Sequence, residues 1–243
     1  MDQIWNNVMQ LSNRPTILVD GGIHAREWIS LAAVLNFINF LQTNTAAVNL
    51  IDELQWFVIP VLDPDGYVYT YTTDSLMRKN RKQSQVNSNC FGTDLNCNYG
   101  YQWDPLESAS NDPYSLVYHG PTPFSEKESI GLRDAMLQQG QTYTSYIIFQ
   151  SYGLFYLYPW LHTDQQTTDW IYLDACAKAA TAVINGKDMF GFINISTLAS
   201  LISLLLTKCS SGVLNYNPGT FDRCYGIKKT NNLLPIYTGI LHS

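Results

Sequence analysis

Short apolar runs alternate with helical patterns over the first two thirds of the chain. Residues 15–22 (PTILVDGG) and 56–67 (WFVIPVLDPDGY) are apolar and end in turn residues, which predicts two buried strands. Between them, from Glu27 onward, apolar residues recur at steps of three and four, which predicts an amphipathic helix. Strand, helix and strand in this order predict a crossover unit.

The alternation continues further along the chain. Residues 125–140 are predicted to form a helix, with a capping box between Ser125 and Glu128 at its start and Gly140 at its end. The apolar residues 143–153 predict a third buried strand.

A further helix is predicted over residues 168–186, where the pattern ends in Asn-Gly. Residues 68–124 are rich in Tyr, Asn and Ser without a sustained period, which predicts surface loops. Alternating strands and helices favour an α/β fold. With 46% hydrophobic residues, the chain is long enough for one large domain over residues 1–243.

Charge and hydropathy exclude two classes of partner. The chain has 14 Lys and Arg against 20 Asp and Glu, a net charge of −6, and its basic residues are scattered apart from a short run at 78–82. This distribution predicts no nucleic-acid partner. No apolar run reaches the ~20 residues needed to cross a bilayer, so no membrane partner is predicted either.

Polar side chains stand at the predicted carboxyl ends of the strands, where α/β sheets bind ligands: His24, Asp65 and Gln150. His24 and Glu27 lie three residues apart, so an imidazole and a carboxylate in the first helical turn can converge on one cation. A catalytic zinc needs a third protein ligand and leaves one position for water. A lone His-x-x-Glu pair is more often a solvated pair or a helix cap, so further support is required.

That support comes from a resemblance. SNRPTILVDGGIHAREWIS resembles the first metal motif of the zinc metallocarboxypeptidases of the pancreatic carboxypeptidase A and B type. VIPVLDPDGY, MRKNRKQ, CFGTDLNCNYGYQW, YHGPTPFSEKES and FQSYGLFYLYPW follow in the family's order. The resemblance implies a mixed, mostly parallel twisted sheet with helices on both faces, incomplete at both ends relative to the family. It also implies zinc-dependent hydrolysis of C-terminal residues from peptides.

The resemblance assigns His24 and Glu27 as zinc ligands and Asp94 as the carboxylate that orients His24. The family's third ligand is a histidine, and its position falls here on Gln150. A glutamine offers only an amide carbonyl, a weaker zinc ligand than imidazole. One zinc ion with reduced affinity is therefore expected.

Substrate-binding positions are partly kept. The resemblance assigns Arg26, Asn96 and Tyr152 to substrate binding, and Arg78 to polarising the scissile carbonyl. Cys97 replaces the arginine that would hold the substrate's terminal carboxylate through a bidentate contact. Plain surface arginines are an equal alternative for Arg26 and Arg78.

The family's general base, a glutamate on a late strand, is not found. YGIKKTNNLLP (225–235) passes directly from the GIK motif to Leu-Leu-Pro, and no Asp or Glu follows Asp222. The position of the family's closing-loop tyrosine falls on Thr207 or Lys208. Because losing a general base costs ~10²–10⁴ in rate, we expect impaired or absent turnover. We also expect a gap or a new pairing in the sheet, and reduced stability.

Alternatives to an impaired metallocarboxypeptidase stay open. One is a weakly active zinc peptidase with Gln150 as third ligand and Glu126 or Glu128 as base. Another is a hydrolase that uses Cys97 with His119.

A third alternative is a non-catalytic protein that holds peptides or an inhibitor through Tyr152, Tyr156 and Trp160. The partners expected in either case are peptide or protein C-termini and a proteinaceous inhibitor. Cys90 is expected to be unpaired, because its disulfide partner in the family falls on Tyr114. The resemblance implies an extracellular protein, although the first residues show no signal-peptide pattern.

Overall fold

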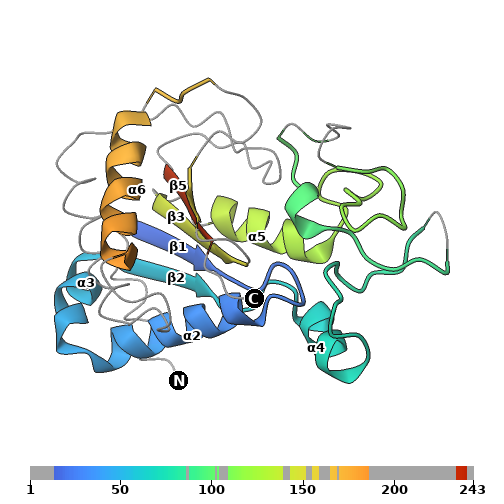
Figure 1. The fold of residues 1–243 in the computed structure, drawn as a ribbon, viewed down its shortest axis with the longest axis horizontal. Helices are drawn as coiled ribbons and strands as arrows, with labels where there is room; N and C mark the ends of the chain where they lie inside the picture. The colour runs from blue at the N-terminus through green and yellow to red at the C-terminus, as the bar shows by residue number, and fades with distance from the viewer. Residues whose placement is uncertain are drawn as a thin grey trace.

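Five strands form one sheet at the centre of the molecule (Figure 1). The structure is a computed structural model, and it describes residues 14–85, 88–101, 103, 109–138, 143–151, 155–158, 165–168, 170–185 and 234–239. The strand order is β2-β1-β3-β5-β4. The strands are β1 (Thr16–Asp20), β2 (Gln55–Ile59), β3 (Tyr143–Gln150), β4 (Phe155–Leu157) and β5 (Leu234–Gly239). All neighbouring pairs are parallel except β4 with β5, which confirms a mixed, mostly parallel sheet.

The predicted crossover unit is present between β1 and β2. Helix α2 (Trp28–Thr43) follows β1, and the chain then forms a 3-10 turn, η1 (Thr45–Ala47), and a short helix, α3 (Val48–Glu53). The side chain of Asn44 accepts a hydrogen bond from the backbone N–H of Ala46 at 2.9 Å, so it caps η1. The sequence pattern did not predict α3, which lies in the connection to β2.

Helices cover both faces of the sheet, as predicted. Successive side chains of β1 point to opposite faces, so Ile17 and Val19 enter one core and Leu18 enters the other. The first core is closed by α2, α3 and α6 (Trp170–Asn185), and the second by α5 (Lys127–Gln138) together with Tyr99. Residues 168–186 were predicted as a helix, and α6 confirms this within two residues.

No single helix in the described part of the chain is long and apolar enough to span a membrane. The pair formed by Trp28–Thr43 and Thr45–Glu53 passes the same test only when its two parts are taken together across a 90° bend. Apolar side chains of this pair pack against β1 and β3 in the first core.

Strand β5 lies between β3 and β4 and pairs with both. It runs parallel to β3 from Ser145 opposite Leu234 to Gln150 opposite Gly239. Of the two outcomes expected for the sheet, a gap or a new pairing, the structure shows a pairing. The segment that begins at Leu234 and Pro235, after the GIK motif, forms a strand beside β3. Asp222, Thr207 and Lys208, on which other expectations rested, lie outside the described residues.

The predicted strand at 56–67 is too long. Strand β2 ends at Ile59, and helix α4 (Pro64–Thr72) begins inside the predicted strand and continues into the predicted loop region. Asp63 caps α4, because its Oδ1 accepts a hydrogen bond from the Gly66 N–H at 3.0 Å, and Pro64 suits the first helical position. Asp65 consequently lies in a helical turn and not at a strand end.

The predicted capping box at residues 125–128 is also wrong. Helix α5 begins at Lys127, two residues after Ser125. The Ser125 hydroxyl donates to the carboxylate of Glu126 at 2.7 Å, and it accepts from the amide of Asn98 at 2.8 Å. Gly140, predicted to end this helix, lies outside the described residues.

Candidate functional site

The candidate site lies just beyond the carboxyl ends of β1 and β3. After β1, Gly22 adopts a φ of 65°, a left-handed conformation that glycine tolerates best, and the chain turns toward α2. His24 and Glu27 occupy the turn before α2, not its first helical turn as predicted. The turn closes by a hydrogen bond from the Glu27 N–H to the His24 carbonyl at 3.1 Å. This turn, rather than the first turn of α2, places the two side chains next to each other.

Both ring nitrogens of His24 contact a carboxylate. Nδ1 lies 2.6 Å from Glu27 Oε1, and Nε2 lies 3.1 Å from Asp94 Oδ1, with all three residues buried. Burial lowers the pKa of His24, but the nearby carboxylates, chiefly Asp94, leave it raised above its usual value. The structure thus places Asp94 against the ring nitrogen opposite Glu27, and its expected role in orienting His24 stays a prediction.

Arg78 supplies a fixed positive charge beside these groups. Its Nε and Nη2 donate to Asp94 Oδ2 at 3.1 and 3.0 Å, and its Nη1 lies 3.7 Å from Glu27 Oε1. Burial raises the pKa of Asp94, but His24 and Arg78 together lower it to about 2. Arg78 is thus part of an internal ion-pair network.

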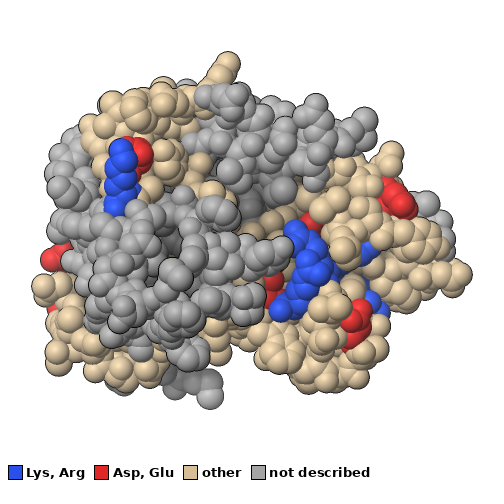
Figure 2. All heavy atoms as spheres, in the orientation of Figure 1, with Lys and Arg blue, Asp and Glu red and all other residues tan. Residues whose placement is uncertain are grey.

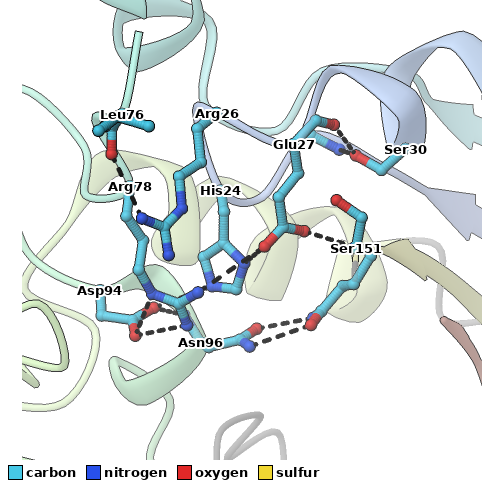
Figure 3. Close-up of polar contacts among 11 residues, drawn as sticks. His24, Arg26, Glu27, Ser30, Leu76, Arg78, Asp94, Asn96 and Ser151 are labelled. Carbon is cyan, nitrogen blue, oxygen red and sulfur yellow. Dashed lines mark hydrogen bonds and ion pairs between the residues drawn. The ribbon is translucent and has the colours of Figure 1, made fainter. Parts of the chain in front are cut away.

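Arg26 takes a different position from Arg78. It is exposed, and its Nη1 donates to the Leu76 carbonyl at 3.4 Å. Figure 3 shows the Arg26 side chain next to those of His24 and Arg78. The sequence predicts roles toward the substrate for Arg26 and Arg78, and of these two side chains Arg26 is the exposed one.

Asn96 and Gln150 form a reciprocal amide pair. Asn96 Nδ2 donates to Gln150 Oε1 at 3.3 Å, and Gln150 Nε2 donates to Asn96 Oδ1 at 2.9 Å. Asn96 lies in the 3-10 turn η2 (Leu95–Cys97), and its N–H donates to Asp94 Oδ1 at 3.1 Å. Sequence reasoning had assigned Asn96 to substrate and Gln150 to the metal, whereas the structure joins them to each other.

These contacts close into a ring around the site (Figure 3). From Gln150 the chain continues to Ser151, whose N–H donates to Glu27 Oε2 at 2.8 Å. We call the following residues the site ring: His24, Glu27, Ser151, Gln150, Asn96 and Asp94. No sequence pattern predicts the Ser151 backbone contact, because it depends on where β3 ends relative to the turn that carries Glu27.

A second residue missed by sequence reasoning is Ser30. Its hydroxyl donates to the Glu27 carbonyl at 2.7 Å and accepts from the Gly22 N–H at 3.0 Å. It therefore braces the turn that holds Glu27. A serine three residues after Glu27, at the start of a predicted helix, was the available signal.

The side chains present do not fit a complete zinc site. His24 Nδ1 and Glu27 converge, which provides two suitable ligands. Asp94 contacts the opposite ring nitrogen, so it cannot serve as the third, and Gln150 offers an amide oxygen that already accepts from Asn96. Among the residues that the structure describes, no group of three or more His, Cys, Asp or Glu could hold a metal ion.

The alternative catalytic residues have other contacts. Glu126 is buried and accepts from Asn80 and Ser125, and Glu128 accepts from the same Asn80 amide. His119 Nδ1 donates to the carbonyl of its neighbour Gly120 at 2.7 Å, and its ring packs edge-on against Trp103. These contacts are typical of structural residues.

The remaining predicted residues divide between the described and undescribed parts of the chain. Cys90 is a buried free thiol, which confirms the expectation that it is unpaired. Cys97 is buried in η2. Tyr156 lies in β4. Tyr152 and Trp160 lie outside the described residues.

The topology and the site together define an α/β protein with a His-x-x-Glu turn at the carboxyl edge of a mostly parallel sheet. The family model described as zinc carboxypeptidase matches residues 3–195, and the chain belongs to this family.

Curated relatives carry carboxypeptidase names. Carboxypeptidase B of Astacus astacus is 39% identical over 170 residues, which make up 70% of this chain and 56% of that protein. A protein of Arthroderma benhamiae named inactive metallocarboxypeptidase ECM14 is 36% identical over 166 residues, 65% of this chain and 28% of that protein. The chain thus spans about half the length of its relatives, or less.

Solved structures agree on the fold. Carboxypeptidase A from Helicoverpa armigera superimposes with a TM-score of 0.70 at 30% identity, over 75% of this chain and 44% of that one. Bovine thrombin-activatable fibrinolysis inhibitor, in complex with tick carboxypeptidase inhibitor, superimposes with a TM-score of 0.69 at 26% identity, over 82% of both chains.

Proposed function

We propose that this chain is a metallocarboxypeptidase-fold protein that binds the C-terminal segments of peptides or proteins and hydrolyses them poorly or not at all. The observation that carries the proposal is the Asn96–Gln150 pair, which places a neutral amide where a third metal ligand is needed. The existence of a relative named as inactive is consistent with such a role.

The proposed function includes only weak zinc binding. His24 and Glu27 bind zinc with reduced affinity, because two strong donors and one amide oxygen form a poorer set than three strong donors. When bound, zinc would supply Lewis acidity to a substrate carbonyl. Strand β5, the described segment beside β3, contains no Asp or Glu that could act as the general base.

Binding relies on positive charge near the site. Figure 2 shows Lys and Arg side chains gathered beside α4 on this face of the molecule. Arg26 lies at the site with its guanidinium exposed, so it is available to a peptide carboxylate. Tyr152 and Asn96 complete the proposed binding set, and Arg78 polarises a bound carbonyl only by leaving its ion pairs with Asp94.

A second class of partner is a proteinaceous inhibitor. The bovine relative binds a tick inhibitor, and the fold shared with it extends over 82% of this chain. Such an encounter fits an extracellular protein, and the disulfide bond of Cys176 favours an oxidising compartment.

Two measurements on the same preparation test the proposal. Fluorescence anisotropy with a labelled peptide should show binding that weakens when the peptide's terminal carboxylate is amidated. Mass spectrometry of the same peptide after prolonged incubation should show no release of C-terminal residues. Release that zinc stimulates and a chelator abolishes would establish a peptidase instead. Equal affinity for the free and the amidated peptide would exclude recognition of the terminus.

A further inference from the structure

We propose that residue 150 decides whether this site holds a metal: the Asn96–Gln150 pair closes the third ligand position, and a histidine at 150 completes a zinc site. The inference rests on the proposed function, because it explains the weak metal binding assumed there. It assigns the Gln150 amide to Asn96 rather than to a metal ion.

Three separate elements fix the position of residue 150. The hydrogen bond from the Ser151 N–H to Glu27 Oε2, at 2.8 Å, holds the end of β3 against the turn that carries His24. On the other side, the Asn96 N–H contacts Asp94, which itself contacts His24. The side chain of residue 150 therefore enters the site ring beside the pair formed by His24 Nδ1 and Glu27.

The amide pair competes directly with a metal for Gln150. Each amide gives one hydrogen to its partner and receives one, at 2.9 and 3.3 Å. If Gln150 Oε1 turned to a cation, it would lose the hydrogen bond that it accepts from Asn96 Nδ2. The ligand gained would be a neutral carbonyl, which zinc binds less well than imidazole.

One neighbour of position 150 carries no side chain. The residue opposite Gln150 in β5 is Gly239, and paired residues of parallel strands point to the same face. A glycine has no side chain to meet the imidazole from that neighbour. Because glutamine and histidine are of similar length, the exchange keeps a nitrogen close to where the amide now ends.

Zinc binding to the purified chain and to its Gln150→His variant tests this inference. The expected result is a rise in zinc affinity on the order of 100-fold, to about one ion per chain after dialysis. With cobalt in place of zinc, the variant should show the visible absorption of a four-coordinate site. The matched control is Gln83→His, which adds a histidine at an exposed position and should bind as weakly as the parent chain.

The outcomes separate this inference from the proposed function. A folded Gln150→His variant with unchanged zinc affinity overturns the inference and leaves the weak site of the parent chain intact. Stoichiometric, tight zinc in the parent chain overturns both. If Gln150→His does not fold, Gln150→Glu provides the second test, because a carboxylate at 150 should also raise zinc affinity over the parent. An unchanged affinity in a folded Gln150→Glu variant counts against the inference equally.

Discussion

On one side of the site ring, His24, Glu27 and Asp94 make charged contacts with one another and with Arg78, whereas on the other side Asn96 and Gln150 form a neutral pair. The charged side is buried, and each of its groups depends on a partner of opposite charge. The neutral side is half-buried, and its two amides exchange reciprocal hydrogen bonds. Arg78 and His24 thus compensate the carboxylates on the charged side, whereas on the neutral side the two amides hydrogen-bond to each other.

Breaking the charged side at Asp94 should have the largest effect. Asp94 is fully buried and accepts hydrogen bonds from His24, Arg78 and Asn96. Asp94→Asn removes the closer of the two carboxylates that compensate Arg78 and leaves only Glu27 at 3.7 Å, so we expect a loss of about 3 to 5 kcal/mol in the free energy of unfolding, measured with urea. Asp52→Asn, on the exposed surface of α3, is the control and should change it by less than ~0.5 kcal/mol. If Asp94→Asn and Asp52→Asn lowered the free energy of unfolding equally, the charged side of the site ring would not have the stabilising role assigned to it here.

The pH dependence expected from Asp20 is opposite to that expected from Asp94. The lowered pKa of Asp94 makes it stabilising as pH rises, whereas the raised pKa of Asp20 makes it destabilising. Burial raises the pKa of Asp20 to about 7, although the hydroxyl of Tyr146 donates to it. Below pH ~4 the folded and unfolded forms are both protonated, and between pH 4 and 7 only the unfolded form ionises. Stability is therefore lost as pH rises over this range, by about 4 kcal/mol in total.

The Asp20→Asn variant isolates this effect. Its free energy of unfolding should fall less than that of the parent chain between pH 4.5 and 7, so the difference between the two proteins grows with pH. Taking the difference cancels contributions from other groups, such as Asp63, whose pKa burial also raises to about 7. Parallel pH profiles for the two proteins would show that Asp20 is ionised in the folded state.

Disrupting the neutral side of the site ring should lower the free energy of unfolding less than the change at Asp94 does. Asn96→Ala, Gln150→Ala and the double variant form a mutant cycle, and we expect a coupling energy of about 1 kcal/mol from chemical denaturation. A coupling close to zero would mean that the two amides contribute independently. A coupling as large as the loss at Asp94 would remove the distinction between the two sides.

The smallest effect on stability is expected at Arg26. Because its guanidinium is exposed, Arg26→Gln should change the free energy of unfolding by less than ~0.5 kcal/mol. The same change should weaken binding of a peptide with a free C-terminus several-fold and leave an amidated peptide unaffected. An equal loss for both peptides would place Arg26 outside carboxylate recognition.

Local sequence patterns predicted β1, α2 and the closeness of His24 to Glu27. The apolar run before Gly21 and the three- and four-residue steps after Glu27 were sufficient for β1 and α2, because both are set by the burial of nearby side chains. Helix α4 was missed because Pro64, Asp65 and Gly66 also suit a turn, and only the cap from Asp63 selects a helix. The pairing of β5 with β3 joins segments far apart in the chain, so no local pattern could predict it.

The sequence by itself determined the family motif, the closeness of His24 to Glu27, and the glutamine at position 150, because residue identity and short spacing are properties of the chain. Only the tertiary structure decided how these residues are used. Asn96 and Gln150 are 54 positions apart, and Arg78 and Asp94 are 16 apart. Whether such groups meet depends on where β3 and η2 end in space. In this structure they form a ring of internal contacts, because a polar group near the core hydrogen-bonds to the partners that the fold places beside it.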